Sequence, residues 1–413
     1  MRPTRRGLLG AALGGVGAVV AGGAGYGIAA ATEDDHSGSA AAEQWAFYGS
    51  HQAGIATPAQ DKLAFAAFDV TSSAVDDLQA MLGAWAAAAS RMTAGLPVGS
   101  VETLPQSPPV DTGEALGLPP ASLTITVGFG PTLFDDRFGL ESRRPAALAD
   151  LPALPGDALD PTRSGGDLCV QACSNDPQVA FHVIRNFARI GRGTAVMRWS
   201  QLGFGRTSTT STTQATPRNL MGFKDGTNNI KSEDSAAMDR FVWVGDETDQ
   251  PWMRGGSYLV SRRIRMLIES WDADYLADQQ NVFGRAKDTG APLNGTQEFD
   301  KVNLTAKTAS GELVIPAEAH IRLASPDSHG GQKILRRGYS YTDGNDPTTG
   351  QLDAGLFFIA FQKDPRKQFV PIQQLLGRRD ALNEYIKHVG SGVFAVPPGV
   401  SAVGDWFGKS LFR

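Results

Sequence analysis

The first half of the chain alternates short apolar runs with amphipathic segments. Apolar runs or a two-residue alternation predict strands at residues 63–70, 122–129, 167–173 and 194–202. Residues 73–92 and 176–189 instead place apolar side chains at helical spacing, behind Ser, Thr or Asp caps. The predicted order is strand, helix, strand, strand, helix, strand. It is typical of a ferredoxin-like α+β domain, in which helices cover one face of an antiparallel sheet.

The second half repeats this logic less clearly. Strands are predicted at residues 241–244, 257–265, 334–341 and 356–362, and helices at 266–271, 274–283 and 371–377. We interpret this half as a second ferredoxin-like domain with a long insertion at about 284–333. The predicted domains are 60–206 and 218–413, separated by a Ser/Thr-rich stretch and preceded by a small, polar linker at 32–59.

The amino terminus has the pattern of an export signal. Arg5 and Arg6 precede a Gly/Ala-rich apolar run that ends at Ala29-x-Ala31. The arginine pair indicates the twin-arginine route for residues 1–31. A membrane anchor is the alternative, because the run is just long enough to span a bilayer. Its weak hydrophobicity favours cleavage. We therefore expect a periplasmic or extracellular/cell-surface protein with no stable membrane span in its mature form.

Composition and residue spacing exclude several classes of function. A formal net charge of −5 over 413 residues argues against a nucleic-acid partner, which requires a basic surface. Zinc-type histidine spacings and the Gly-x-Ser-x-Gly turn of hydrolases are missing from the sequence. Cys169 and Cys173 would lie roughly 13 Å apart on one predicted strand, which is too far for a disulfide. We interpret them as small buried apolar residues.

Three segments carry candidate chemistry. In residues 220–229, Asp225 lies between an aromatic segment and a Gly-Thr-Asn turn, a pattern that alone predicts a hairpin or Asx turn. His320 lies in an apolar context between two prolines, where a hydrogen-bonded core histidine is the simpler interpretation. Arg336 and Arg337 lie within an apolar strand, so they must be paired or face an anionic ligand. His388 is assigned to the polar end of a helix.

Together these segments resemble the dye-decolorizing (DyP-type) haem peroxidases, within them the exported deferrochelatase/peroxidase branch. The matching pieces are Gly-Phe-Lys-Asp-Gly-Thr-Asn at 222–228, Ala-His-Ile-Arg at 319–322, the double-arginine strand at 334–341, Gly-Leu-Phe-Phe-Ile-Ala-Phe at 355–361, and Gly-Arg-x-Lys at 284–287. Their order and spacing hold across residues 60–410. The resemblance implies two ferredoxin-like halves with non-covalent haem b between them.

The resemblance also implies a role for individual residues. His320 is the proximal iron ligand, Asp225 the distal acid/base, and Arg336, the first of the arginine pair, the distal arginine. The implied haem contacts are the backbone of Gly226, Thr227 and Asn228, the apolar Leu356 and Phe358, and the propionate-side Arg322, Arg285 and Lys287. Ala286 departs from the pattern, because some relatives carry a histidine there.

The implied activity is reduction of hydrogen peroxide coupled to one-electron oxidation of organic substrates such as dyes, phenolics or porphyrinogens. The alternative is a haem-handling deferrochelatase with partners in an iron-uptake system, which the same residues would serve. A secreted binding module without catalysis is a further alternative. A homo-oligomer is left open. Oxidation of bulky substrates at the surface would use aromatic residues, for which Tyr258, Tyr339, Tyr341, Trp252 and Trp271 are candidates, although most aromatic residues are core residues.

Overall fold

The computed structural model describes residues 44–99 and 104–413. The predicted signal at residues 1–31 and the first part of the predicted linker lie outside these residues. Within the part of the chain that the structure describes, no helix combines the length and apolar character needed to cross a membrane.

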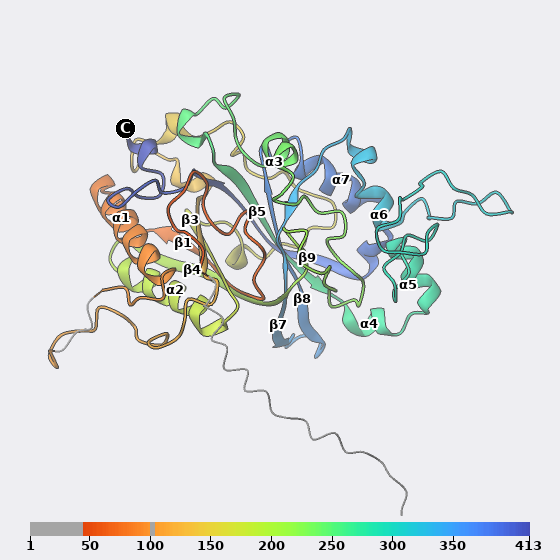
Figure 1. The fold of residues 1–413 in the computed structure, drawn as a ribbon, viewed down its shortest axis with the longest axis horizontal. Coiled ribbons are helices and arrows are strands. Elements are labelled where there is room, and N and C mark those ends of the chain that lie inside the picture. The colour runs from red at the N-terminus through yellow and green to blue at the C-terminus, as the bar shows by residue number, and fades with distance from the viewer. Residues whose placement is uncertain (1–43, 100–103) are drawn as a thin grey trace, which may run out of the picture. The chain divides into compact units, whose positions relative to one another are not determined.

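The first half forms the predicted ferredoxin-like arrangement. Its elements are β1 (Lys62–Val70), α1 (Val75–Met92), β2 (Thr124–Phe129), β3 (Leu168–Ser174), α2 (Pro177–Ile190) and β4 (Ala195–Arg206). The spatial order β4-β1-β3-β2 is antiparallel throughout. Helix α2 begins where the Asp176 side chain accepts hydrogen bonds from two backbone amides, with Pro177 in the first turn. In Figure 1, α1 and α2 lie together beside this sheet.

The second half repeats the same strand order. Its strands are β5 (Ser257–Met266), β6 (Leu335–Arg336), β7 (Tyr339–Asn345), β8 (Leu352–Gln362) and β9 (Ile386–Val396). Strands β6 and β7 pair one after the other with β8, so they occupy one position in the sheet. The resulting order β9-β5-β8-β7 places the fourth, first, third and second strands as in the first half. Both halves are therefore ferredoxin-like.

The helices of the second half are short and gather around β8 and β9. They are α3 (Ser235–Phe241), α4 (Ile268–Asp272), α5 (Leu276–Phe283), α6 (His320–Leu323) and α7 (Phe369–Arg379). Single-turn 3₁₀ helices lie at Pro131–Leu133, Glu141–Arg143, Pro161–Arg163, Pro251–Met253, Pro326–His329, Ala381–Glu384 and Lys409–Phe412. Figure 1 shows α4 to α7 on the side of the molecule opposite to α1 and α2.

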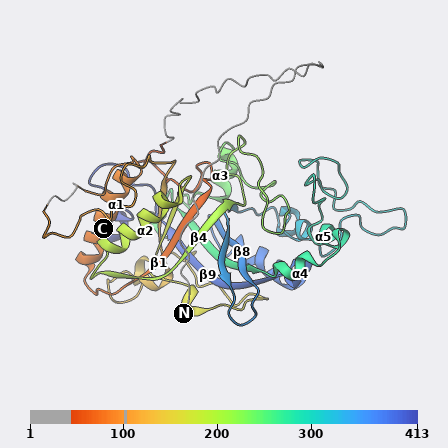
Figure 2. The same cartoon turned by 90° about the horizontal axis from the view of Figure 1, so that it is seen from below.

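The two half-sheets join into one closed sheet. Strand β4 pairs with β7, β2 pairs with β9 through Phe129 and Ala395, and β5 pairs with β8. Figure 2 shows the labelled strands β1, β4, β8 and β9 of the two halves in one view, and the ring of Phe65 in β1 lies 5.1 Å from that of Phe357 in β8 inside the closed sheet. Both halves fill the interior with apolar side chains, namely Leu63, Phe65, Cys169, Cys173, Leu259, Tyr339, Tyr341, Phe357, Ile359, Phe361, Phe394 and Val396. Closure removes open sheet edges and gives the two halves a shared core.

Three expectations for the second half and the aromatic residues are wrong. Phe241 ends α3 instead of starting a strand, because a four-residue apolar run does not distinguish a strand from a helix end. Strand β9 was not predicted, since glycines interrupt its apolar pattern. His388 lies in β9, paired with Ile264 and buried, because pairing with β5 outweighs local preference. The five aromatic candidates for surface oxidation, Tyr258, Tyr339, Tyr341, Trp252 and Trp271, are all at most 4% exposed.

Candidate active site

Asp225 and Arg336 form an ion pair although 111 residues separate them in the sequence. Arg336 Nη1 lies 2.6 Å from Asp225 Oδ1, and both side chains are partly buried. The other carboxylate oxygen, Oδ2, accepts a long hydrogen bond of 3.4 Å from Asn219 Nδ2. The structure therefore joins the predicted acid/base and the predicted arginine, and it holds the carboxylate by donors on both oxygens.

Asn229 fixes the backbone of Arg336. Its Oδ1 accepts from Arg336 N at 2.8 Å, while its Nδ2 donates to Arg336 O at 2.8 Å and to Thr209 O at 2.9 Å. Asn229 is buried, whereas the predicted contact residue Asn228 is exposed. Sequence reasoning missed Asn229. The signal available was that Asn229 immediately precedes the apolar Ile230 and so lies closer to the core.

His320 opens α6 and is held by Asp380. Its Nδ1 lies 2.6 Å from Asp380 Oδ2, and Asp380 is buried at the start of the Ala381–Glu384 turn. Burial opposes the charged imidazolium, but the Asp380 carboxylate outweighs burial and raises the pKa of His320 above its ordinary value. Among residues 44–99 and 104–413, none forms a hydrogen bond with His320 Nε2. That nitrogen is free to bind a metal, and Asp380 supplies the carboxylate that orients the ring.

Gly284 lets the end of α5 pack against the histidine segment. It has a left-handed φ of +79°, and an added Cβ would lie 2.8 Å from Ile321 Cγ1 and 3.2 Å from Ala319 Cβ. The ring of Phe283 lies 6.1 Å from that of His320, in edge contact. A glycine is required here by backbone conformation and by space. The Gly-Arg-x-Lys stretch therefore begins beside His320.

The three predicted propionate-side cations are all engaged with protein groups. Arg285 is buried, and its Nη1 donates to Gly290 O at 2.6 Å and Glu298 O at 3.0 Å. Burial, with the positive charge of Arg336 adding to it, lowers the pKa of Arg285. Arg322 donates to Pro316 O and Ile315 O. Lys287 Nζ donates to Gln279 Oε1 at 2.7 Å and lies over the rings of Phe223 and Trp271. Of the three, Arg285 is the buried one.

The apolar wall predicted from the sequence lies on the same face as Arg336. Phe357 and Ile359 point into the shared core, so Leu356 and Phe358 point to the opposite face of β8. Arg336 pairs with Ala360, which continues that outer face. Leu356 and Phe358 are partly buried. Arg336 and two large apolar side chains thus share one surface of the second sheet.

The predicted backbone contacts lie in a tight turn next to Asp225. Gly226 has a φ of +91°, and an added Cβ would lie 2.8 Å from Ser208 Cα. The side chain of Thr227 donates to Glu298 Oε1 at 3.0 Å. The turn is therefore packed against residue 208 on one side and held by a buried carboxylate on the other.

The donor set fits a haem better than a bare metal ion. Within the described part of the chain, no group of three or more His, Cys, Asp or Glu side chains could hold a metal. An iron bound by His320 Nε2 would therefore need its other ligands from a macrocycle and not from protein side chains. Leu356 and Phe358 offer apolar surface, and Arg285 and Arg336 offer positive charge for carboxylates.

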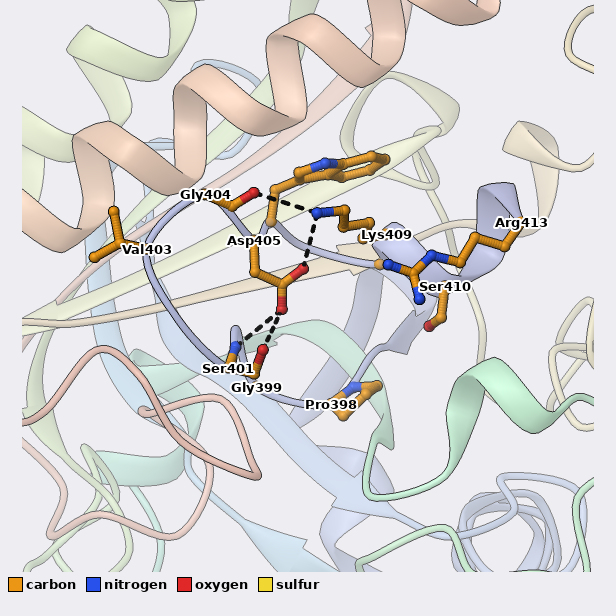
Figure 3. Close-up of a pocket in the computed structure, with 11 residues that line it drawn as sticks. Pro398, Gly399, Ser401, Val403, Gly404, Asp405, Lys409, Ser410 and Arg413 are labelled. Carbon is orange, nitrogen blue, oxygen red and sulfur yellow. Dashed lines mark hydrogen bonds and ion pairs between the residues drawn. The ribbon is translucent and has the colours of Figure 1, made fainter.

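A pocket of about 400 Å³ lies elsewhere, within the carboxyl-terminal tail (Figure 3). Residues between 398 and 413 line it, and none of the predicted site residues is among them. Asp405 lies at its centre, where it accepts from Ser401 and lies 3.9 Å from Lys409 Nζ. This pocket is therefore not part of the candidate active site.

Comparisons with known proteins agree with the geometry. The profile of the Dyp-type peroxidase N-terminal domain matches residues 52–205, and that of the C-terminal domain matches 216–401. Deferrochelatase from Escherichia coli strain K12 is 39% identical over 376 residues, 90% of this chain and 88% of the relative. Deferrochelatase from Yersinia pseudotuberculosis is 38% identical over 406 residues, 96% of this chain and 92% of the relative.

Solved structures show the same similarity. Ferric DtpA from Streptomyces lividans is 43% identical with a TM-score of 0.82, covering 90% of this chain and 97% of its own. A DyP-type peroxidase from Streptomyces coelicolor is 42% identical with a TM-score of 0.82, covering 90% and 98%. A DypB variant from Rhodococcus jostii RHA1 in complex with heme shares the fold at 21% identity and a TM-score of 0.57, covering 88% and 97%.

Proposed function

Because this chain belongs to the Dyp-type peroxidase family and is a haem peroxidase, we propose that Asp225, Arg336 and His320 carry its reaction. The enzyme reduces hydrogen peroxide and oxidises organic substrates, with haem as cofactor. Two contacts carry the assignment. Arg336 contacts Asp225, which is 111 positions away in the sequence, and His320 contacts Asp380, which is 60 positions away.

His320 holds the cofactor from the proximal side. When bound, haem supplies the electrons that reduce peroxide and accepts electrons singly from organic donors. His320 Nε2 would bind the haem iron, and Asp380 accepts the hydrogen bond that Nδ1–H donates. This contact fixes the tautomer and the ring orientation, and it increases the basicity of the ligand nitrogen.

Asp225 moves the proton on the opposite side. Its carboxylate takes a proton from peroxide at Oδ2, whose contact to Asn219 is long and readily exchanged, and returns it to the departing oxygen as water forms. Arg336 stays paired with Oδ1 and supplies fixed positive charge where negative charge develops as the O–O bond breaks. Leu356 and Phe358 exclude water from that surface, which strengthens both electrostatic interactions.

The remaining haem contacts are assigned in the same way. Gly226, Thr227 and Asn228 would contact the cofactor through their backbone, and Arg285, Arg322 and Lys287 would bind its propionates. All three cations already donate hydrogen bonds to protein groups, and a cation would have to exchange such a partner where the propionate needs the same nitrogen. These assignments are supported by position and charge.

The absorption spectrum of protein purified from haem-replete cells tests this function. We expect a Soret band that changes within seconds of adding peroxide, and dye oxidation that requires peroxide. A colourless protein, or a His320→Ala variant with an unchanged haem spectrum, would contradict the assignment.

Iron release from haem is a second proposed activity. It is supported by the relatives named deferrochelatase, which are 38–39% identical over most of the chain. Partners from an iron-uptake system belong to this proposal. Incubation of the haem-loaded protein should release iron and leave fluorescent protoporphyrin IX; fluorescence no higher than that of haem alone would refute it.

A homo-oligomer stays a prediction, for which light scattering is the measurement.

Export is also part of the proposal. Arg5, Arg6 and the following apolar run support the twin-arginine route to the periplasm or the cell exterior, including the cell surface. Substitution of both arginines by lysine should retain the protein in the cytoplasm. A mature protein that begins at Met1 would contradict cleavage.

A further inference from the structure

Glu298 contacts the turn that carries Asp225 at two points, one before and one after Asp225 in the sequence. It lies in the long segment between α5 and α6. Its Oε2 forms an ion pair with Lys224, the residue before Asp225, and its Oε1 accepts from Thr227 Oγ1 at 3.0 Å. One carboxylate therefore holds both flanks of the proton-transferring residue.

Glu298 is itself held in place and buried. Arg285 Nη1 donates to its backbone carbonyl at 3.0 Å, and the residue is 9% exposed. Burial opposes ionisation, but hydrogen bonds from Lys224, Thr216 and Thr227 outweigh it and lower the pKa of Glu298. Glu298 thus carries a full negative charge at neutral pH.

The segment between α5 and α6 packs closely against the whole turn. The backbone of Arg218 forms an isolated antiparallel β-bridge with that of Lys224. The Arg218 side chain donates to Gly222 O on the turn, and to Lys287 O and Asp288 O on the segment. An added Cβ on Gly290 would lie 2.7 Å from Lys224 Cδ. Glu298 is therefore the charged contact within a continuous interface. The same segment leads directly to His320 at its far end.

The negative charge of Glu298 matters because Asp225 is surrounded mainly by positively charged groups. The titratable and charged groups near the turn are Arg336, Lys224, Arg285, Lys231, Arg218, Lys287, Glu298, Glu233 beside Lys231, and His320. Both Lys231 and Arg285 have pKa values lowered chiefly by burial, and both interact with Glu298 and Arg336. Cations thus outnumber carboxylates around Asp225, and Glu298 offsets part of the excess.

We propose that Glu298 is a positioning residue for Asp225, which fixes the two flanks of its turn and limits the net positive charge around it. This inference rests on the proposed role of Asp225. Loss of the contacts moves the carboxylate away from the peroxide. Loss of the charge alone leaves the cations less balanced, so the ionised form of Asp225 persists to lower pH.

Two substitutions separate these effects. Glu298→Gln removes the charge and keeps the shape, whereas Glu298→Asp keeps the charge and withdraws it from Lys224 and Thr227. Glu312→Gln is the matched control, because Glu312 is an exposed residue of the same segment. The rate constant of the haem-loaded enzyme with peroxide is measured by stopped flow from pH 3 to pH 8.

For Glu298→Gln we expect the acid limb of the profile to move down by about half a pH unit or more. The rate at the optimum should fall several-fold. Glu298→Asp should show the lower rate, but the acid limb of its pH profile should stay at the wild-type pH. Glu312→Gln should match the wild type in both. Amide hydrogen exchange at residues 219–229 should quicken in both Glu298 variants with and without haem, while β5 stays unchanged.

A Glu298→Gln enzyme with the limb, rate and exchange of the Glu312→Gln control overturns the inference. The comparison with Asp225→Asn keeps this failure distinct from failure of the proposed function. If Asp225→Asn also reacts at the wild-type rate, the role of Asp225 is wrong. If only the Asp225 variant is slow, the role of Glu298 alone is wrong. Glu298→Asp serves as the second variant if Glu298→Gln does not fold.

Discussion

Replacement of Asp225 by asparagine removes the proposed proton acceptor and should leave the shape of the turn intact. The amide oxygen can still accept from Arg336 Nη1, which lies 2.6 Å from Oδ1 in the native protein. Because both side chains are only partly buried, we expect the lost ion pair to cost below about 1 kcal/mol of folding free energy. Folding and haem loading should therefore survive the substitution.

The reaction with peroxide should be affected far more than stability. General acid–base catalysis typically contributes about 10²–10⁴-fold, equivalent to about 2.7–5.4 kcal/mol in the barrier. The unmatched Arg336 charge retains part of the electrostatic stabilisation, so the loss should lie toward the lower end of that range. Oxidation of the organic donor, which follows peroxide reduction, should change little when measured separately.

Stopped-flow absorbance of the haem-loaded protein measures the step directly. Asp405→Asn is the matched control, because Asp405 also lies near a cation, Lys409 at 3.9 Å, but in the carboxyl-terminal pocket. An Asp225→Asn rate within about threefold of this control would refute the reasoning, since that is far below the usual contribution of a proton-transfer group.

Three further predictions concern the proximal side. Asp380→Asn should weaken haem retention about 10–100-fold, measured by haem transfer to apomyoglobin, and unchanged retention would exclude Asp380 as the orienting group. In haem-free protein the pKa of His320 is raised in the folded state. Its contribution to stability is therefore complete below the unfolded value of about 6.5 and lost as pH rises through the folded value. Thermal melts should show this loss above pH 6.5, and Asp380→Asn should abolish it; equal slopes in the two proteins would contradict the linkage. Gly284→Ala should destabilise by about 1–3 kcal/mol, because it forces a left-handed Cβ against Ile321, and an unchanged melting temperature would show that the contact relaxes freely.

The fold of the first half could be predicted because its periodicities are local. Strands and helices there lie within a few residues of the expected positions, and α2 begins at its predicted cap. Strand β9 could not be predicted in the same way. Its register of ten residue pairs with β5 is a tertiary contact, and Gly390 and Gly392 hide its apolar face in the sequence.

The candidate site shows the same difference between local sequence patterns, which could be interpreted, and tertiary contacts, which could not. His320, Asp225 and Arg336 stand in short motifs and were assigned from them by resemblance. Their partners were not found, because Asp380, Asn219, Asn229 and Glu298 are ordinary polar residues distant in sequence, whose value depends on which side chain they meet. Asn228 stays a prediction as a backbone haem contact, and its neighbour Asn229 holds the backbone of Arg336. Arg285, Arg322 and Lys287 also stay predictions, and each of them donates hydrogen bonds to protein groups.

The shared core of the closed sheet bears on how this molecule could be divided. At one seam the ladder consists of a single pair, Phe129 with Ala395, yet Gln52 bonds to both Val127 and Pro397 across it. Cleavage in the stretch 207–217 would give two fragments, each with an aromatic face that only the other can cover. Such fragments should precipitate when produced separately and reconstitute when produced in the same cell. A split version of this enzyme would then form a coloured oxidation product only where its two fragments associate.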